Sequence, residues 1–517
     1  MKRTTLSLIA AATALAAVTG FASVSSGPSG DDASAKTAAQ LPVERSSVLC
    51  PAPSQSDLAD TDYTSYTPPG GTGKTADGSA DDGKSGSADL VPAGTGASAT
   101  GKSGGKAKDS GKGGAGSSAR TKPFLTLKTP GTPVGDSVSG ADAPALVGTA
   151  DGALAPGWTV QQTTSVEAGT GRGLSGLSCS APDTDFYFPG ASTAKSRNDY
   201  IHLTNPDDEA AVVDVQMYGP DGAIKSDVAE GIQVGPHSSV PVLLSTLTDK
   251  PYDDLTLHVT ARSGRVAAAV AVADDKLGGD WLPAAADPAT SLVLPGIPKD
   301  ATSVHLVAFA PGQDDADLKI RLATSTGTIT PAGHDTLHVK SGMTASADLG
   351  ALTRGDAGSL ILTPSEGSVP VVAALRVTRG KGANQETAFI PATRDIGARA
   401  TVAGNHAKDT TLALTAPGAT GTVKVTASPG TGGGTATTKE YTVKGGTTLS
   451  VTPPVPDGLK GAYALTVQPV SGGRVYGARM LSRKQDGVPA FTVQTLPDDR
   501  GTVSVPQAGE DLKVLQK

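Results

Sequence analysis

The stretch LTLHVTARSGRVAAAVAV, residues 255–272, decides the fold class of this chain. Apolar and polar residues alternate over its first half, an apolar run fills its second half, and a Ser-Gly pair separates the two. Alternation with a period of two is typical of a half-buried strand, and a Gly-containing break between two such runs predicts a β-hairpin. Two later stretches have the same layout, LILTPSEGSVPVVAALRV at 360–377 and ALTVQPVSGGRVYGARML at 464–481.

The predicted hairpin is the end of a longer repeat. Each copy has an earlier strand-like run ending at a proline, at 199–206, 303–311 and 410–417, so the period is about 105 residues. About seven short strands in 100 residues is the pattern of a β-sandwich, often immunoglobulin-like. A period this long indicates tandem domains and not a solenoid. We therefore predict an all-β chain of tandem immunoglobulin-like β-sandwiches, with domains at 184–290, 291–397 and 398–500 and a C-terminal tail at 501–517.

Residues 41–183 resemble a fourth, divergent copy. SVLCPAP at 47–53 matches the early strand, and PALVGTADGALAPGWTVQQT at 144–163 matches the predicted closing hairpin. Between them lies a tract at 70–119 that is dominated by Gly, Ser, Ala, Thr, Lys and Asp and contains no aromatic residue. Such a composition cannot bury enough apolar surface to offset its ordering entropy. We predict that 70–119 is a disordered loop inserted into the first sandwich and dispensable for folding.

The N-terminus has the layout of a secretory signal peptide over residues 1–26. Lys2 and Arg3 precede an apolar run from about Leu6 to Val18, and small residues follow. The alternative is an uncleaved membrane anchor, because the apolar stretch is nearly long enough to span a bilayer. We expect an exported protein that is secreted or associated with the cell envelope, with no membrane span beyond this segment. The mildly acidic net charge of −7 does not favour a nucleic-acid partner.

Three enzyme-like motifs occur in the chain. GASATGKS at 96–103 fits the phosphate-binding loop, and GKSGG at 101–105 fits the nucleophile elbow of hydrolases. Both lie in the Gly/Ser tract, where neither the preceding strand nor the following helix of a phosphate loop is expected. GRGLSG at 171–176 fits the dinucleotide-binding pattern but leads into LSCSAP and not into a helix, so we predict a loop there. The sequence therefore predicts no catalytic residue and no cofactor.

The sequence contains only weak signals for a metal site and for an adhesion motif. His334 and His338 are four residues apart, which on a strand separates them by about 13 Å, too far for one metal ion. The acidic turns at 207–209 and 314–317 could bind calcium weakly, but the third repeat lacks them, so we expect solvated turns and no metal site. The RGD triplet at 354–356 is interpreted as a chance match.

Cys50 and Cys179 are the two cysteines of the chain. Export places them in an oxidising compartment, where an isolated pair most often forms a disulfide. Cys50 is expected on an early strand of the first copy and Cys179 on or just after its last strand, and these strands commonly lie side by side or face each other in sandwiches. We predict a Cys50–Cys179 disulfide. The alternatives are free thiols, a redox role and a bond to another chain; neither cysteine has a C-x-x-C partner.

The basic-apolar N-terminus and the segments LPVERSSVLCPAP and GRGLSGLSCSAPDTDFYFPG make the chain similar to an exported actinobacterial, Streptomyces-like protein family of unknown function. The similarity covers nearly all of the chain after the signal segment, except the tract 70–119. Genes of that family lie near glycosyltransferase genes, which implies a role at the cell envelope. The resemblance implies no activity and no catalytic residue.

Three functions are compatible with these observations. We expect an exported, non-enzymatic modular protein with a scaffold or binding role at the cell envelope, whose contacts are made by loops at the sandwich ends. The partner, an envelope protein or a glycan, is not identified. The main alternative is a glycan-binding or glycan-assembly accessory protein, with candidate aromatic residues Trp158, Trp281, Tyr187, Tyr200, Tyr252 and Tyr476. A lesser alternative is an enzyme whose site is not visible in the sequence.

Overall fold

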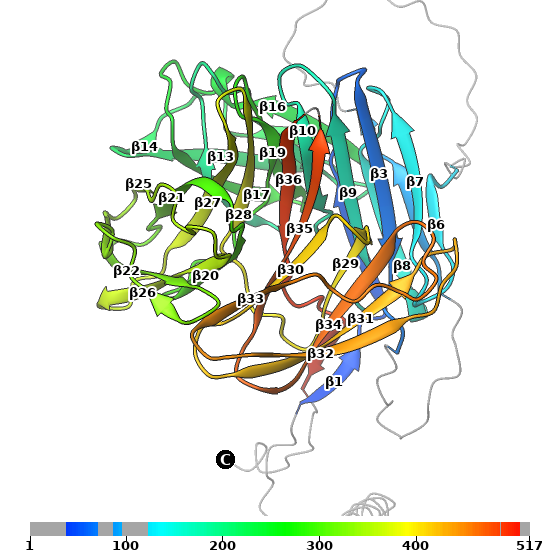
Figure 1. Cartoon of the computed structure of the whole chain (residues 1–517). Coiled ribbons are helices and arrows are strands. Elements are labelled where there is room, and N and C mark those ends of the chain that lie inside the picture. The colour runs from blue at the N-terminus through cyan, green and yellow to red at the C-terminus, as the bar shows by residue number, and fades with distance from the viewer. Residues whose placement is uncertain (1–37, 71–85, 96–121, 486, 507–517) are drawn as a thin grey trace, which may run out of the picture. The chain divides into compact units, whose positions relative to one another are not determined.

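The structure is a computed structural model that describes residues 38–70, 86–95, 122–485 and 487–506. The predicted signal peptide and the phosphate-loop match lie outside the described residues. The chain divides into two compact units, one comprising 42–503 and the other the two ends of the chain. Strands β1 (Ala39–Pro42) and β37 (Thr502–Val505) pair as a two-stranded sheet near these ends. All other elements belong to the large unit, and over its described residues they are strands apart from two short 3-10 turns (Figure 1).

The first half of the large unit contains two sandwiches. The strands of the first sandwich are β2 (Arg45–Cys50), β3 (Ala59–Tyr66), β4 (Ala88–Pro92), β6 (Leu125–Leu127), β7 (Val134–Ser139), β8 (Leu146–Asp151), β9 (Thr159–Val166) and β10 (Gly173–Ser178). Those of the second are β11 (Asp185–Ala191), β12 (Tyr200–Thr204), β13 (Ala211–Gly219), β14 (Gly222–Ile224), β15 (Ile232–Val234), β16 (Ser238–Leu243), β17 (Leu255–Ser263), β18 (Ala267–Asp274) and β19 (Gly278–Leu282). Single 3-10 turns η1 (Gly152–Leu154) and η2 (Leu244–Thr246) lie in the connections.

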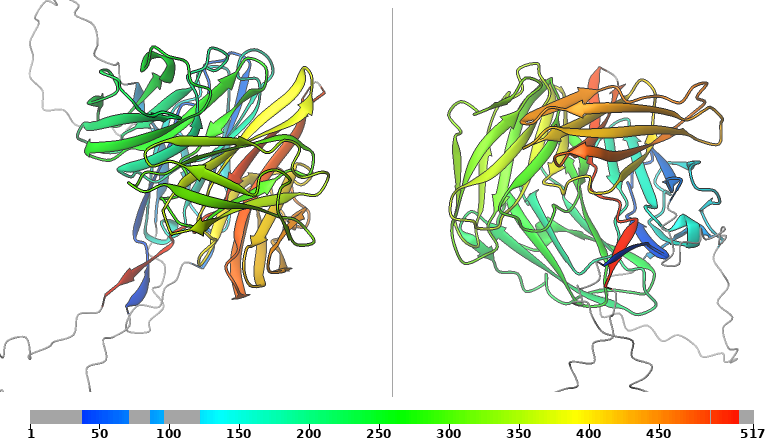
Figure 2. Two further views of the ribbon diagram at one scale, coloured as in Figure 1. Left: turned by 90° about the vertical axis from the view of Figure 1, so that its left-hand side faces the viewer. Right: turned by 90° about the horizontal axis from the view of Figure 1, so that it is seen from below.

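The second half contains two more. The third sandwich has β20 (Leu292–Ile297), β21 (Ala301–Phe309), β22 (Ala316–Ala323), β23 (Thr328–Ile329), β24 (Thr336–Val339), β25 (Thr344–Asp348), β26 (Gly358–Glu366), β27 (Val372–Lys381) and β28 (Asn384–Pro391). The fourth has β29 (Ala400–Asn405), β30 (Thr410–Ala416), β31 (Gly421–Pro429), β32 (Thr437–Val443), β33 (Thr447–Val451), β34 (Tyr463–Gly472), β35 (Tyr476–Gln485) and β36 (Val488–Thr495). In both views of Figure 2 the yellow-to-orange strands of the fourth sandwich lie beside the green strands of the third.

All four sandwiches share one strand order. When the strands of a sandwich are numbered from 1 to 8 along the chain, one sheet has the order 1-6-3-4 and the other 8-7-2-5. In the second and third sandwiches the fourth strand is split into two short pieces, β14 with β15 and β23 with β24. The predicted all-β fold is confirmed, and the first copy has the same strand order as the three more regular ones.

The core of each sandwich lies between its two sheets. In the second sandwich, Val213 and Val215 of β13 alternate with less buried residues and meet Ile201 and Leu203 of β12 from the opposite sheet. Alternate residues of a strand point to opposite faces, so each strand covers the core with every second side chain. Full burial of one such side chain stabilises the fold by about 1.5–3 kcal/mol. The other three sandwiches have clusters of the same kind.

The stretch 255–272 is not a hairpin in the structure. The two predicted strands and the turn are present, as β17, β18 and Gly264, whose φ of +70° favours glycine. However, β17 pairs with β11 and β13 in one sheet, whereas β18 pairs with β12 and β19 in the other. The turn therefore carries the chain across the core. The sequence pattern does not distinguish the two arrangements. Two strands that face each other across a core need one apolar face each, and so do two strands that pair in one sheet.

Strands β4 and β5 (Gly94–Thr95) contradict the prediction that the whole tract 70–119 is disordered. β4 is an inner strand that pairs with β8 on one side and β6 on the other, and its Ala88 and Leu90 are buried in the core. β5 pairs in parallel with β16 and covers the edge of a sheet of the second sandwich. The prediction is therefore wrong for residues 88–95. The stretches 71–85 and 96–119 lie outside the described residues.

Candidate functional site

The last strands of the four sandwiches meet inside the large unit. Each of these strands, β10, β19, β28 and β36, stands at the end of its sheet and pairs with one neighbour only. Each packs against two of the other three, and the four lie close together in Figure 1. We call this place the central junction. Its polar members come from all four sandwiches or their connecting turns: Arg172, Asp280, Glu386, Thr492 and Gln494.

Two carboxyl groups of the central junction bind the open edge of β10. The N–H of Leu174 donates to Glu386 Oε1 at 3.2 Å, and the N–H of Gly176 donates to Asp280 Oδ1 at 3.0 Å. These N–H groups, two residues apart, point away from β9 because alternate residues of an edge strand face outward. A buried N–H without an acceptor destabilises a fold by about 1–3 kcal/mol. Side chains of the second and third sandwiches thus satisfy a strand of the first.

The glycines of GRGLSG make room for these contacts. A Cβ on Gly173 would overlap the Glu386 carboxyl group, and a Cβ on Gly176 would overlap the Gln494 amide. Gly173 also has a φ of +118°, which other residues rarely adopt. The prediction of a loop at 171–176 is wrong from Gly173 onward, because that part is strand β10. The glycines allow side chains of other sandwiches to approach β10 closely. This requirement cannot be read from the sequence of β10 alone.

Burial dominates the electrostatics of the central junction. Burial raises the pKa of Glu386 to about 9 and raises the pKa of Asp280 well above its usual range. Asp280 also accepts from the hydroxyl of Thr492, at 3.0 Å to Oδ1 and 3.2 Å to Oδ2. Arg172 Nη1 lies 3.9 Å from Glu386 Oε2, while its Nη2 donates to the carbonyl groups of Lys276 and Gln385 at 3.0 and 3.3 Å. The junction therefore holds two buried carboxyl groups whose pKa values burial raises.

The raised pKa of Glu386 predicts a specific pH dependence. The folded protein keeps this proton up to about pH 9, whereas the unfolded chain releases it above its ordinary pKa of 4.5. The stabilising contribution is thus complete below pH 4.5 and is lost as the pH rises towards 9, because unfolding releases a proton in that window. We expect Glu386→Gln to flatten the fall of unfolding free energy between pH 5 and 9, measured by urea titration.

Glu440 offers the control for this experiment. It is exposed on β32, so Glu440→Gln removes the same carboxyl group without touching a buried site. We expect its pH profile to follow that of the wild type. A Glu386→Gln profile parallel to both would show that this carboxyl group does not hold a proton in the folded protein at neutral pH.

A family model described as a family of unknown function (DUF5719) matches residues 134–454. The chain belongs to this family. The DUF5719 match includes the second and third sandwiches and reaches into the first and fourth, so Arg172, Asp280 and Glu386 lie within it and Thr492 does not. A search of curated proteins finds no match.

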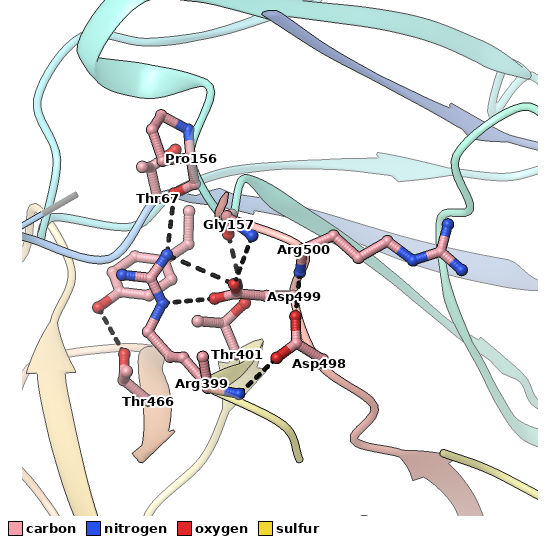
Figure 3. Close-up of polar contacts among 12 residues, drawn as sticks. Thr67, Pro156, Gly157, Arg399, Thr401, Thr466, Asp498, Asp499 and Arg500 are labelled. Atoms are coloured by element: carbon pink, nitrogen blue, oxygen red, sulfur yellow. Dashed lines mark hydrogen bonds and ion pairs between the residues drawn. The ribbon is translucent and has the colours of Figure 1, made fainter. Parts of the chain in front are cut away.

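A second buried joint in this DUF5719 protein links the first and fourth sandwiches (Figure 3). Arg399 Nε donates to Asp499 Oδ2 at 2.5 Å, and Arg399 Nη2 donates to the carbonyl group of Pro156 at 3.2 Å. The hydroxyl of Thr401 donates to the carbonyl group of Gly157 at 3.4 Å. Burial raises the pKa of Asp499, and the hydrogen bond from Arg399 lowers it. The joint binds the turn at 156–157 between β8 and β9 to the start and end of the fourth sandwich.

The predicted disulfide is confirmed. Cys50 is the last residue of β2 and Cys179 directly follows β10, as the sequence predicted, and their Cα atoms are 4.7 Å apart. Cys50 is fully buried and Cys179 is 7% exposed. The bond joins the two sheets of the first sandwich, because β2 and β10 belong to opposite sheets.

Some of the histidines and acidic-turn residues form close side-chain pairs, whereas His334 donates its backbone N–H to the carbonyl group of Pro331. His338 lies 2.8 Å from Asp317, Arg265 lies 2.9 Å from Asp207, and His237 lies 2.7 Å from Asp208. Over the described residues, no group of three His, Cys, Asp or Glu side chains is placed to hold a metal ion. No helix in the described part of the chain is both long and apolar enough to cross a membrane.

Sequence reasoning missed Asp280, Glu386 and the Arg399–Asp499 pair. Asp280 and Glu386 are single acidic residues within their strands, and Asp499 lies in a short acidic turn after the last strand of the fourth sandwich, so no local pattern distinguishes them. The one signal in the sequence is the spacing of glycines at 171–176, which indicates close packing as well as it indicates a dinucleotide-binding loop. The junction forms only when sandwiches that are distant in sequence come together.

Proposed function

We propose that this protein is an exported, non-enzymatic scaffold or binding protein of the cell envelope, from an actinobacterial, Streptomyces-like source. The apolar, basic N-terminus supports export. The enzyme-like motifs predict no catalytic residue, which favours a role in binding. The ends of the sandwiches carry most of the connecting loops, and such loops are the usual contact surfaces of sandwich proteins.

The observation that carries the scaffold role is the buried polar contact between sandwiches. Asp280 accepts from Gly176 and Thr492, which belong to two other sandwiches, and Arg399 contacts Pro156 across a third boundary. Domains joined by flexible linkers do not form such contacts. Here the buried polar groups are satisfied by partners from other sandwiches, so the sandwiches must stay packed together. A protein whose sandwiches are joined in this way presents its loops in a fixed relative arrangement, which suits the binding of a large or composite partner.

The test is a pull-down from envelope extract with the chain from residue 27 onward as bait. We expect a specific protein that, once purified, binds the bait directly. The same bait, reduced and heat-unfolded, is the control, because the loops form defined surfaces only while the sandwiches are folded. Recovery of no protein beyond that control would overturn the scaffold role.

Glycan binding is the alternative function, and its aromatic candidates differ in exposure, with Tyr252 and Tyr476 half-buried. Trp158 and Trp281 are 6% and 2% exposed, so their ring faces are covered. Tyr187 stacks on His258 with ring centroids 4.2 Å apart. Tyr200 is 38% exposed and offers an open ring for a sugar. Recovery of glycan in the pull-down, lost in Tyr200→Ala, would favour this alternative over the scaffold role.

A further inference from the structure

One end of the third sandwich contains an open cavity of about 560 Å³. Three connections form its wall. The turn between β20 and β21 contributes Lys299, the loop between β25 and β26 contributes Arg354, and the end of β27 contributes Lys381. We call it the cationic cavity. Its volume is within the range of about 300–1,000 Å³ that is typical of small-molecule sites.

The charge of the cationic cavity is positive, although the chain as a whole carries −7. Within the part of the chain that the structure describes, Lys299, Arg354 and Lys381 form no ion pair. The one acidic residue of the wall, Asp300, is bound by two nitrogen atoms of Arg379 at 2.9 and 2.7 Å. Its charge is thereby compensated, and three free cations surround the cavity.

The backbone holds Arg354 in place. Its φ of +48° lies in the left-handed region, which is unfavourable for a residue with a side chain. The hydroxyl of Thr353 and the N–H of Gly355 both donate to the carbonyl group of Lys299, at 3.2 and 3.0 Å. The strained residue is therefore tied on both sides to the turn that carries the first lysine. Strain maintained by such contacts is common at binding sites.

The two charged residues of the RGD triplet at 354–356 have different surroundings. The carboxyl group of Asp356 accepts from the hydroxyl of Ser325 at 2.7 Å and from its N–H at 3.1 Å. Asp356 does not line the cationic cavity, whereas Arg354 does. The acidic residue anchors the loop, and the basic residue faces the cavity.

The wall also limits the ligand chemistry. Besides the charged residues it consists of alanine, threonine and glycine, with no aromatic side chain on which a base or a sugar ring could stack. Charge and hydrogen bonds then supply the specific part of recognition. Arg354 offers a planar fork for carboxylate or phosphate, and the lysines offer point charges. We propose that the cationic cavity binds an anionic ligand bearing carboxylate or phosphate groups.

The test is calorimetric titration of the full chain at low salt with three polymers: polygalacturonate, polyphosphate and neutral dextran. We expect binding to one of the two acidic polymers and none to dextran, and the polymer that binds identifies the anionic group. The triple variant Lys299→Gln, Arg354→Gln and Lys381→Gln should bind at least about tenfold more weakly, because each exposed charge pair contributes modestly and three are lost. Added salt should weaken wild-type binding.

The matched control replaces three exposed lysines elsewhere, Lys225→Gln, Lys408→Gln and Lys460→Gln. It has the same change in net charge and should bind within about twofold of the wild type. Equal loss in both triple variants, or no binding of either acidic polymer by the wild type, would overturn the proposal. If the cavity variant melts early, single Lys381→Gln, at a hairpin end, is the variant to compare. The proposal is independent of the scaffold role, since a failed pull-down leaves this titration interpretable.

Discussion

Replacing Leu90 by alanine is expected to lower the free energy of unfolding of the first sandwich by about 2–5 kcal/mol. Leu90 is fully buried on β4, with strands β8 and β6 on either side. A Cβ on Gly148 would lie 2.6 Å from Leu90 Cδ2 and 2.6 Å from Trp158 Cη2, so both side chains pack directly over this glycine. Truncation therefore opens a cavity beside an aromatic ring whose indole N–H is held by a hydrogen bond to the hydroxyl of Ser65 at 2.9 Å.

Leu58 provides the matched control, because it is 51% exposed in the same sandwich. Leu58→Ala is expected to change stability by about 0.5 kcal/mol or less. Urea unfolding followed by the fluorescence of Trp158, in a Trp281→Phe background, reports on the first sandwich alone. Equal midpoints for the two leucine variants would mean that residues 88–95 do not belong to the core, and would restore the sequence prediction that the whole tract 70–119 is dispensable.

The fate of β4 shows why that prediction failed. The strand has five residues, ADLVP, and Gly and Ser surround it on both sides, so the composition of any window around it is that of a flexible tract. Its apolar pattern is too short to be distinguished from chance. What makes it a strand is pairing with residues 146–150 of β8, a partner that local sequence does not reveal.

The alternating runs, by contrast, were sufficient to predict strands, turns and the four copies. Period-two alternation reports which face of a strand is buried, and a Gly at the turn reports a positive φ. Neither reports whether two successive strands pair or face each other, which is why 255–272 was predicted as a hairpin. The same limit hid the central junction, because Asp280 and Glu386 satisfy β10 only after three separate sandwiches have packed together.

Removing the Cys50–Cys179 bond is the second change with a large expected effect. The two residues are 129 apart in sequence, so the bond shortens the unfolded chain of almost the whole first sandwich. Loop-entropy arguments give a loss of about 5 kcal/mol at most for a loop of this size, and residual structure in the unfolded state reduces it. We expect the double variant Cys50→Ala and Cys179→Ala to lose a substantial part of this free energy in urea unfolding of the first sandwich. Alanine keeps both positions small and apolar, which the buried surroundings require.

Thiol titration separates the bond from packing as the cause. The wild type, unfolded in urea without reductant, should show no free thiol and should run as a monomer without reductant. Reduced wild type should match the double variant in unfolding free energy, because both lack the cross-link. Since the reduced protein keeps both sulfur atoms in the core, this comparison controls for side-chain packing. Two free thiols, or a dimer that reduction separates, would contradict the intramolecular bond. A reduced wild type as stable as the oxidised one would show instead that the contacts already joining the two sheets, such as the mutual backbone hydrogen bonds of Leu49 and Ser180, hold the first sandwich without the sulfur bridge.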